Sequence, residues 1–234
     1  MQWTTGWAHP VVEVTPAPDP TRLATESPSP SPELHTSMAQ LLEHADQDGG
    51  AEVHYRKALD LEPNNLDAQL GYARLLARTG REEEAAAWFE KSCQEYPQNA
   101  TAHNDLGLCY AQCGRKEDAL EPLSQAVELQ PDRVLYRNNI AHILLELGRR
   151  EEALRQLATV HPPAVAHYNV GYLLRTNGEQ QQAAIHFRQA LAIDPEFESA
   201  QIWSSHLATE GVDQSTNVRE DLLAERQSGY ETLE

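Results

Sequence analysis

The chain has 234 residues, of which 40% are hydrophobic and 6% aromatic, and its formal net charge is −18 at pH 7. So acidic a chain is a poor ligand for nucleic acid or an anionic membrane surface, because both are bound through clustered Lys and Arg side chains. No apolar run approaches the ~20 residues of a membrane-spanning helix, so these quantities exclude non-specific nucleic-acid binding and a membrane span.

Residues 1–31 are predicted to be a disordered, Pro/Ser-rich segment, because seven of the 14 prolines fall within the first 32 residues. Proline fixes φ and donates no backbone hydrogen bond, which favours extended chain over a packed element. Trp3 and Trp7 lie in this segment and are either mobile and loosely packed or part of a short docking motif. The segment has no apolar core of a signal peptide, so we expect a cytoplasmic protein, or a periplasmic or cell-envelope one if an upstream signal is missing.

The middle of the chain repeats with a period of 34 residues. Prolines stand at positions 63, 97 and 131 and glycines at 80, 114 and 148, followed by a proline at 195 and a glycine at 178. Each unit contains two segments with apolar residues at i, i+3, i+4 and i+7, the spacing of an amphipathic helix. The units are 32–65, 66–99, 100–133, 134–163 and 164–197, and a capping helix is predicted at 198–208. The first unit is the weakest, with Asp46 where a turn glycine is expected.

Small residues recur where the two helices of a unit should cross closely. Two short helices cannot bury their apolar faces alone, so each pair needs the next one. In the first helices the small positions are Ala39, Ala73, Gly107, Ala141 and Gly171; in the second helices they are Ala51, Ala85, Ala119, Ala153 and Ala183. Large residues alternate with them: Met38, Tyr72, Leu106, Ile140 and Val170, then Tyr55, Phe89, Leu123, Leu157 and Phe187.

The fourth unit is four residues shorter than the others, which removes roughly 6 Å of its second helix at 1.5 Å per residue. Pro162 and Pro163 prevent that helix from continuing. The deletion is either a tolerated change in superhelical twist or a notch on the convex side where a partner docks.

This combination of period, small–large alternation and closing proline resembles the tetratricopeptide repeat (TPR) over about 165 residues. The resemblance implies an all-α, right-handed superhelical solenoid of about five helix pairs. It also implies a protein-interaction module that binds a peptide or a partner helix in a concave groove lined by each first helix. The expected function is therefore a non-catalytic adaptor or scaffold. The alternatives are a cell-envelope protein of bacterial pilus or secretion assembly, and a purely structural self-associating repeat.

Helical phase predicts which side chains of the first helices face the groove. Asparagine amides suit an extended peptide backbone, and tyrosines supply rigid contact area. Some of these residues could instead only bridge neighbouring helices. The candidate peptide-binding residues are Arg74, Arg78, Asn104, Leu108, Asn138, His142, Tyr168, Asn169, Tyr172 and Arg175. We expect a concave face less negative than the convex one, with Arg74, Arg78 and Arg175 as local positive points.

The sequence contains no motif for catalysis or for a cofactor, so we expect neither an enzyme nor a cofactor site. Cys109 and Cys113 are four residues apart on one helical face, where buried packing is favoured over a metal site. The partner should be a protein or peptide, and the chain a monomer or weak dimer. Residues 209–234 are predicted to form an acidic, flexible tail.

Overall fold

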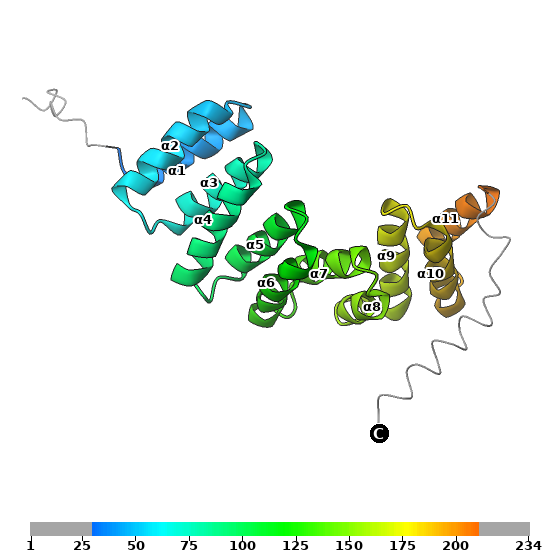
Figure 1. The fold of residues 1–234 in the computed structure, drawn as a ribbon. Helices are drawn as coiled ribbons and strands as arrows, with labels where there is room; N and C mark the ends of the chain where they lie inside the picture. Colours follow the sequence, from blue (N-terminus) through cyan, green and yellow to red (C-terminus); the bar gives the residue numbers. More distant parts are fainter. Residues whose placement is uncertain (1–29, 211–234) are drawn as a thin grey trace, which may run out of the picture.

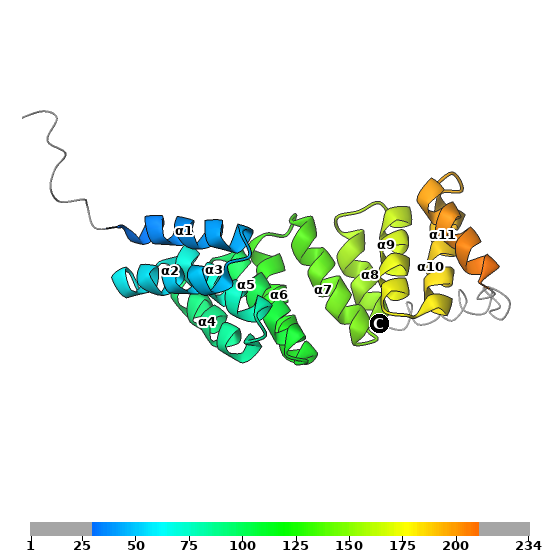
Figure 2. The same cartoon turned by 90° about the horizontal axis from the view of Figure 1, so that it is seen from above.

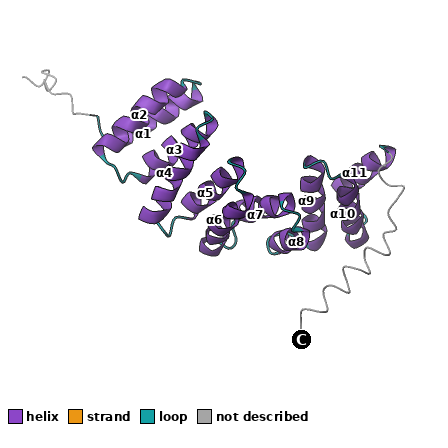
Figure 3. Cartoon of the chain, viewed as in Figure 1, coloured by secondary structure: helices purple, strands orange, loops and turns teal. Residues whose placement is uncertain are grey.

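The computed structural model describes residues 30–210, which fold into eleven helices with no strand among them (Figures 1 and 3). Ten helices form five consecutive pairs, and the last one stands alone. The pairs are α1 (Pro32–His44) with α2 (Asp48–Leu61), α3 (Leu66–Arg78) with α4 (Glu82–Glu95), α5 (Ala100–Gln112) with α6 (Lys116–Leu129), α7 (Val134–Glu146) with α8 (Arg150–Ala158), and α9 (Pro163–Thr176) with α10 (Gln180–Ile193); α11 spans Glu198–Thr209. Residues 1–29 and 211–234, which make up most of the predicted end segments 1–31 and 209–234, lie outside the described residues.

Each helix packs mainly against the helices before and after it, so the molecule is a curved, elongated array rather than a globule (Figures 1 and 2). The first helices of successive pairs also contact one another, from α1 with α3 to α7 with α9. Second helices of successive pairs contact one another less. The first helices therefore line the inner side of the curve. Among the helices of residues 30–210, none is both long and apolar enough to cross a bilayer.

The small residues lie at the helix crossings, as predicted. All five alanines predicted in the second helices are completely buried. A Cβ atom added to Gly107 would lie 2.6 Å from Leu123 Cγ and 3.0 Å from the carbonyl oxygen of Ala119. Close approach of the two backbones is therefore what excludes larger side chains there.

The large residues fill the spaces between helices, with one exception. Tyr55, Phe89, Leu123, Leu157 and Phe187 are all at most 2% exposed. Met38 was predicted to be buried like them but is 36% exposed. The prediction is wrong at this position because, among the described residues, no repeat precedes α1 to cover it.

The turns between paired helices require a left-handed residue. Gly80, Gly114, Gly148 and Gly178 have φ values of 80°, 78°, 75° and 86°, and Asp46 occupies the same place with φ 55°. Glycine adopts this conformation without steric cost, whereas an L-residue is strained in it.

A matched pair of substitutions tests this requirement. Gly80→Ala should lower the free energy of unfolding by ~1 kcal/mol, and Asp46→Gly should raise it by a similar or smaller amount. Urea denaturation followed by circular dichroism measures both changes. The same sign for the two variants would contradict the argument.

The fourth repeat has a short second helix, as predicted. α8 has 9 residues, whereas the other second helices have 14. α9 begins directly at Pro163. By contrast, Pro122 lies buried inside α6, which continues as one helix from Lys116 to Leu129.

Candidate functional site

The concave side of the first three repeats contains three adjoining hollows. One of about 390 Å³ lies between α1 and α3, one of about 410 Å³ between α3 and α5, and one of about 490 Å³ beside the end of α1. Arg74 lines the first two hollows and Arg78 the last two. We call this surface the N-terminal groove; its main lining residues are Gln40, Glu43, Leu70, Arg74, Arg78 and Leu108.

Two arginines join successive first helices across the N-terminal groove. The guanidinium of Arg74 donates to Asp105 of α5, with Nη2 2.6 Å from Oδ2. Arg78 lies 3.1 Å from Glu43 and 2.8 Å from Asp48, and these two carboxylates raise the pKa of its guanidinium. The side chains remain about half exposed, at 52% and 45%. Both arginines, predicted as local positive points, are therefore paired with carboxylates that offset their charge.

The floor of the N-terminal groove contains a buried tyrosine. Tyr55 is 1% exposed, and its hydroxyl donates to Glu43 at 2.6 Å. Burial, followed by the hydrogen bond to Glu43, raises the pKa of this phenol. Glu43 therefore holds both Tyr55 and Arg78, which fixes α1 against α2 and α3.

The middle of the concave side is polar. Asn104 was predicted to face a partner, but it is 4% exposed, and its Oδ1 accepts a hydrogen bond from Asn139 Nδ2 at 2.7 Å. It therefore bridges α5 and α7 instead of facing a peptide. Asn138 and His142 are half-buried on α7. The Oδ1 atom of Asn138 is buried and has no hydrogen-bond partner within residues 30–210.

Aromatic side chains gather where α9 meets α11. The ring of Tyr172, 43% exposed, lies 6.5 Å from Trp203 and 6.5 Å from Tyr168. Tyr168 also contacts Phe187 and Phe197, so it faces the core more than the groove. We call Tyr168, Tyr172, Phe197, Trp203 and His206 the aromatic patch. Asn169, on the same helix, is half-buried.

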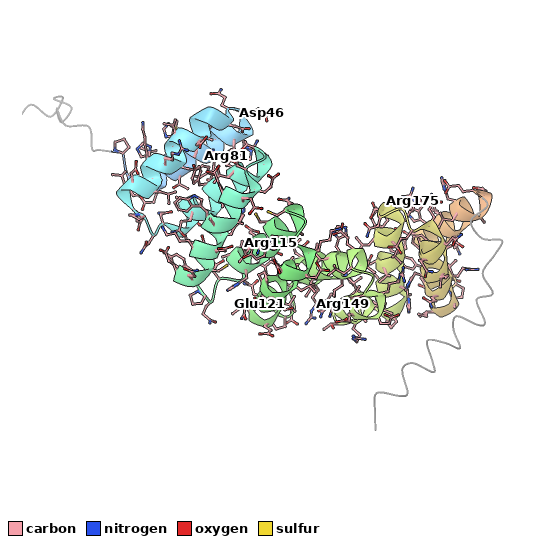
Figure 4. The ribbon with its side chains drawn as sticks, in the orientation of Figure 1. Asp46, Arg81, Arg115, Glu121, Arg149 and Arg175 are labelled. Atoms are coloured by element: carbon pink, nitrogen blue, oxygen red, sulfur yellow. The ribbon has the colours of Figure 1, made fainter. Side chains whose placement is uncertain are left out.

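Arg175 covers one edge of the aromatic patch. Its guanidinium carbon lies 3.8 Å from the centroid of the Trp203 ring, which is a cation–π contact. Figure 4 shows Arg175 at the end of α9 nearest α11. Trp203, on the predicted capping helix, packs on the last apolar face of the array and also contacts Tyr172 on the concave side.

One row of the repeat register connects the N-terminal groove with the aromatic patch. The ninth residue of each repeat unit lies on the inner side of its first helix, and the sequence identified four members of this row: Arg74, Leu108, His142 and Tyr172. The same register extends to Gln40 in α1 and to His206 in α11. Gln40 lines two of the hollows, and His206 contacts Trp203 at 5.7 Å. Counting the period outward to both ends would have found them.

The arrangement offers contact surface and hydrogen bonds but no chemistry for thiolate ligation. Cys109 is 2% exposed, and burial raises the pKa of its thiol to about 12. Across residues 30–210, no three His, Cys, Asp or Glu side chains converge as metal ligands. Cys109 therefore packs in the core, with Cys113 partly buried beside it.

Family models described as tetratricopeptide repeat match residues 50–100, 94–134 and 164–197, which together make up half of the chain. The chain belongs to the tetratricopeptide repeat family. The models leave out the shortened fourth repeat, whose missing residues break the period. The fold is accordingly that of a right-handed TPR solenoid, and the chain is a protein–protein interaction adaptor in the general sense of this family, whose members are typically non-catalytic.

Several solved structures are similar over most of both chains. YrrB, described as a TPR protein with an unusual peptide-binding site, is 26% identical, with a TM-score of 0.54 over 72% of this chain and 89% of its own. MamA is 17% identical, with a TM-score of 0.58 over 72% and 94%. Pseudomonas aeruginosa pilF is 20% identical, with a TM-score of 0.57 over 76% and 82%. A comparison with curated protein sequences finds no match.

Proposed function

We propose that this TPR protein is an adaptor that binds an extended segment of a partner protein along its concave side, from the N-terminal groove to the aromatic patch. The observation that carries the proposal is the row from Gln40 to His206, because it joins hollows and exposed aromatic rings on consecutive first helices. The likeness to YrrB and its peptide-binding site supports this reading. The likeness to pilF, at 20% identity, is one of fold and does not favour a role in pilus assembly.

The residues along the row define the partner's chemistry. Tyr172 and Trp203 offer a rigid apolar surface, which favours a large apolar side chain on the partner. Asn138 is half-buried on α7, and an asparagine amide can form hydrogen bonds with a partner's backbone. Arg74 and Arg78 are already neutralised by acids, and the chain as a whole carries −18. The partner segment is therefore uncharged or basic, with at least one large apolar side chain.

Peptides selected from a displayed random library against the full chain test this proposal. Asn138→Ala with Tyr172→Ala should weaken binding of the selected peptides by about a hundredfold, as expected for two central contacts of ~1.4 kcal/mol each. Helicity and melting temperature should remain nearly unchanged, because neither side chain is buried in the core.

The matched control is Val53→Ala with Leu61→Ala on α2, two exposed apolar residues of a second helix. This variant should bind like the unmodified chain. Unchanged binding by the groove variant, with loss in the α2 variant, would place the binding surface on the convex side.

A further inference from the structure

The first helix of the array presents an apolar stripe to solvent. Leu34, Met38 and Leu41 are 52%, 36% and 61% exposed, and their spacing of i, i+4 and i+7 puts them on one face of α1. We call these three residues the α1 stripe. Among the described helices, α2 and α3 are the ones that pack substantially on α1.

The α1 stripe occupies the positions through which every inner repeat docks. The residues equivalent to Leu34 and Met38 in the later first helices are at most 7% exposed: Ala68, Ala102, Tyr136 and Ala166, then Tyr72, Leu106, Ile140 and Val170. Those equivalent to Leu41 are 2% exposed at Leu75, Cys109 and Ile143, and Leu173 is partly buried. The α1 stripe is therefore the kind of surface on which a preceding repeat would pack, and nothing within residues 30–210 covers it.

We propose that residues 3–12 of the same chain cover the α1 stripe, with Trp3 and Trp7 as the main apolar contacts. The chain that precedes α1 enters at the end of the stripe itself, because Ser31 caps the helix by accepting from the Leu34 backbone N–H at 3.3 Å. The intervening residues 13–30 can reach about 56 Å at ~3.1 Å per residue in extended, proline-rich form. The stripe extends for only ~10 Å along α1, so the segment can turn back and reach all of it.

Charge and tethering favour this occupant over a second copy of the chain. Residues 1–12 contain no Asp, Glu, Lys or Arg, whereas a second copy would bring another −18 charges. A short flexible tether gives an effective concentration on the order of millimolar. Three half-exposed side chains also offer much less than the ~800 Å² per partner of a stable interface between separate molecules.

Residue-resolved oxidation of the full chain by hydroxyl radicals, read by mass spectrometry, tests the proposal. Leu34→Ser with Leu41→Ser should raise the oxidation rate of Trp3 and Trp7 by about fivefold, because they lose their docking surface. The matched control, Val53→Ser with Leu61→Ser on α2, should leave both rates unchanged. No increase in the stripe variant, or an equal increase in the control, would overturn the proposal.

A reciprocal measurement keeps the proposal testable if the stripe variant loses α1. In Trp3→Ser with Trp7→Ser, amide exchange of α1 should become about fivefold faster while exchange of α9 stays the same; unchanged exchange of α1 would overturn the proposal. In the unmodified chain, the oxidation rates should not depend on concentration. A rise on tenfold dilution would assign the stripe to a second copy and overturn the assignment to residues 3–12.

Discussion

Phe187→Ala is expected to lower the free energy of unfolding of the fifth repeat by about 3–5 kcal/mol. The side chain is completely buried, and its ring contacts Tyr168 at 5.7 Å. A Cβ atom on Gly171 would lie 2.9 Å from its Cε1 atom, so the ring fills the space that the glycine leaves. Removing the ring leaves a cavity between α9 and α10 that rigid helices can only partly close.

Urea denaturation and amide exchange together measure the size and the extent of this effect. Exchange should accelerate in α9, α10 and α11 and remain nearly unchanged in α1 to α4, because each repeat is stabilised by its neighbours. The control is Ile202→Ala, at a 65% exposed side chain, which should change stability by less than about 0.5 kcal/mol. Equal acceleration along the whole array would contradict the nearest-neighbour account.

The second large effect is a loss of stability in mild acid that depends on His186. This side chain is 5% exposed, and its Nδ1 lies 3.2 Å from that of His167. Burial, followed by the nearby His167 and Arg150, lowers the pKa of His186 to about 3 from an ordinary 6.5. Below pH 6.5 the unfolded chain binds a proton at this position that the folded chain does not bind. Stability is therefore complete above pH 6.5 and falls as the pH falls toward 3, by about 2 kcal/mol at pH 5.

His186→Gln isolates this effect because it removes the titrating group and keeps a polar side chain of similar size. Between pH 7.5 and pH 5, the unmodified chain should lose about 2 kcal/mol more stability than the variant, as measured by urea denaturation. Carboxylates that are paired with arginine, such as Glu52, have lowered pKa values. Their protonation therefore reduces stability only at a lower pH than the range compared here. If the free energies of unfolding of the two proteins changed in parallel with pH, the pKa of His186 would not be lowered by folding, and the prediction would be wrong.

The repeat period was sufficient to predict the fold because each residue type that recurs with this period is required by the local structure. Gly80 and its equivalents are needed for positive φ, and Gly107 and its equivalents for close backbone approach. These requirements are the same in every unit, so they are visible in one sequence. The period also predicted the short helix α8, because a four-residue deletion cannot be absorbed by turns of fixed length.

The parts that the sequence did not predict depend on contacts between repeats. Met38 has the same position as Tyr72, but its exposure depends on what precedes α1. The partner of Arg74 is Asp105, 31 residues further along the chain, and that of Asn139 is Asn104, 35 residues earlier. Helical phase places such residues on the inner face, whereas the curvature of the array decides whether they face a partner protein or each other.

Photo-crosslinking of a library-selected peptide to the full chain, followed by mass spectrometry of the joined fragments, tests the central claim most directly. With the crosslinker next to the peptide's large apolar residue, we expect joined fragments from α7, α9 and α11, including Tyr172 or Trp203. Crosslinks confined to the second helices, α2, α4, α6, α8 and α10, would contradict binding along the concave side.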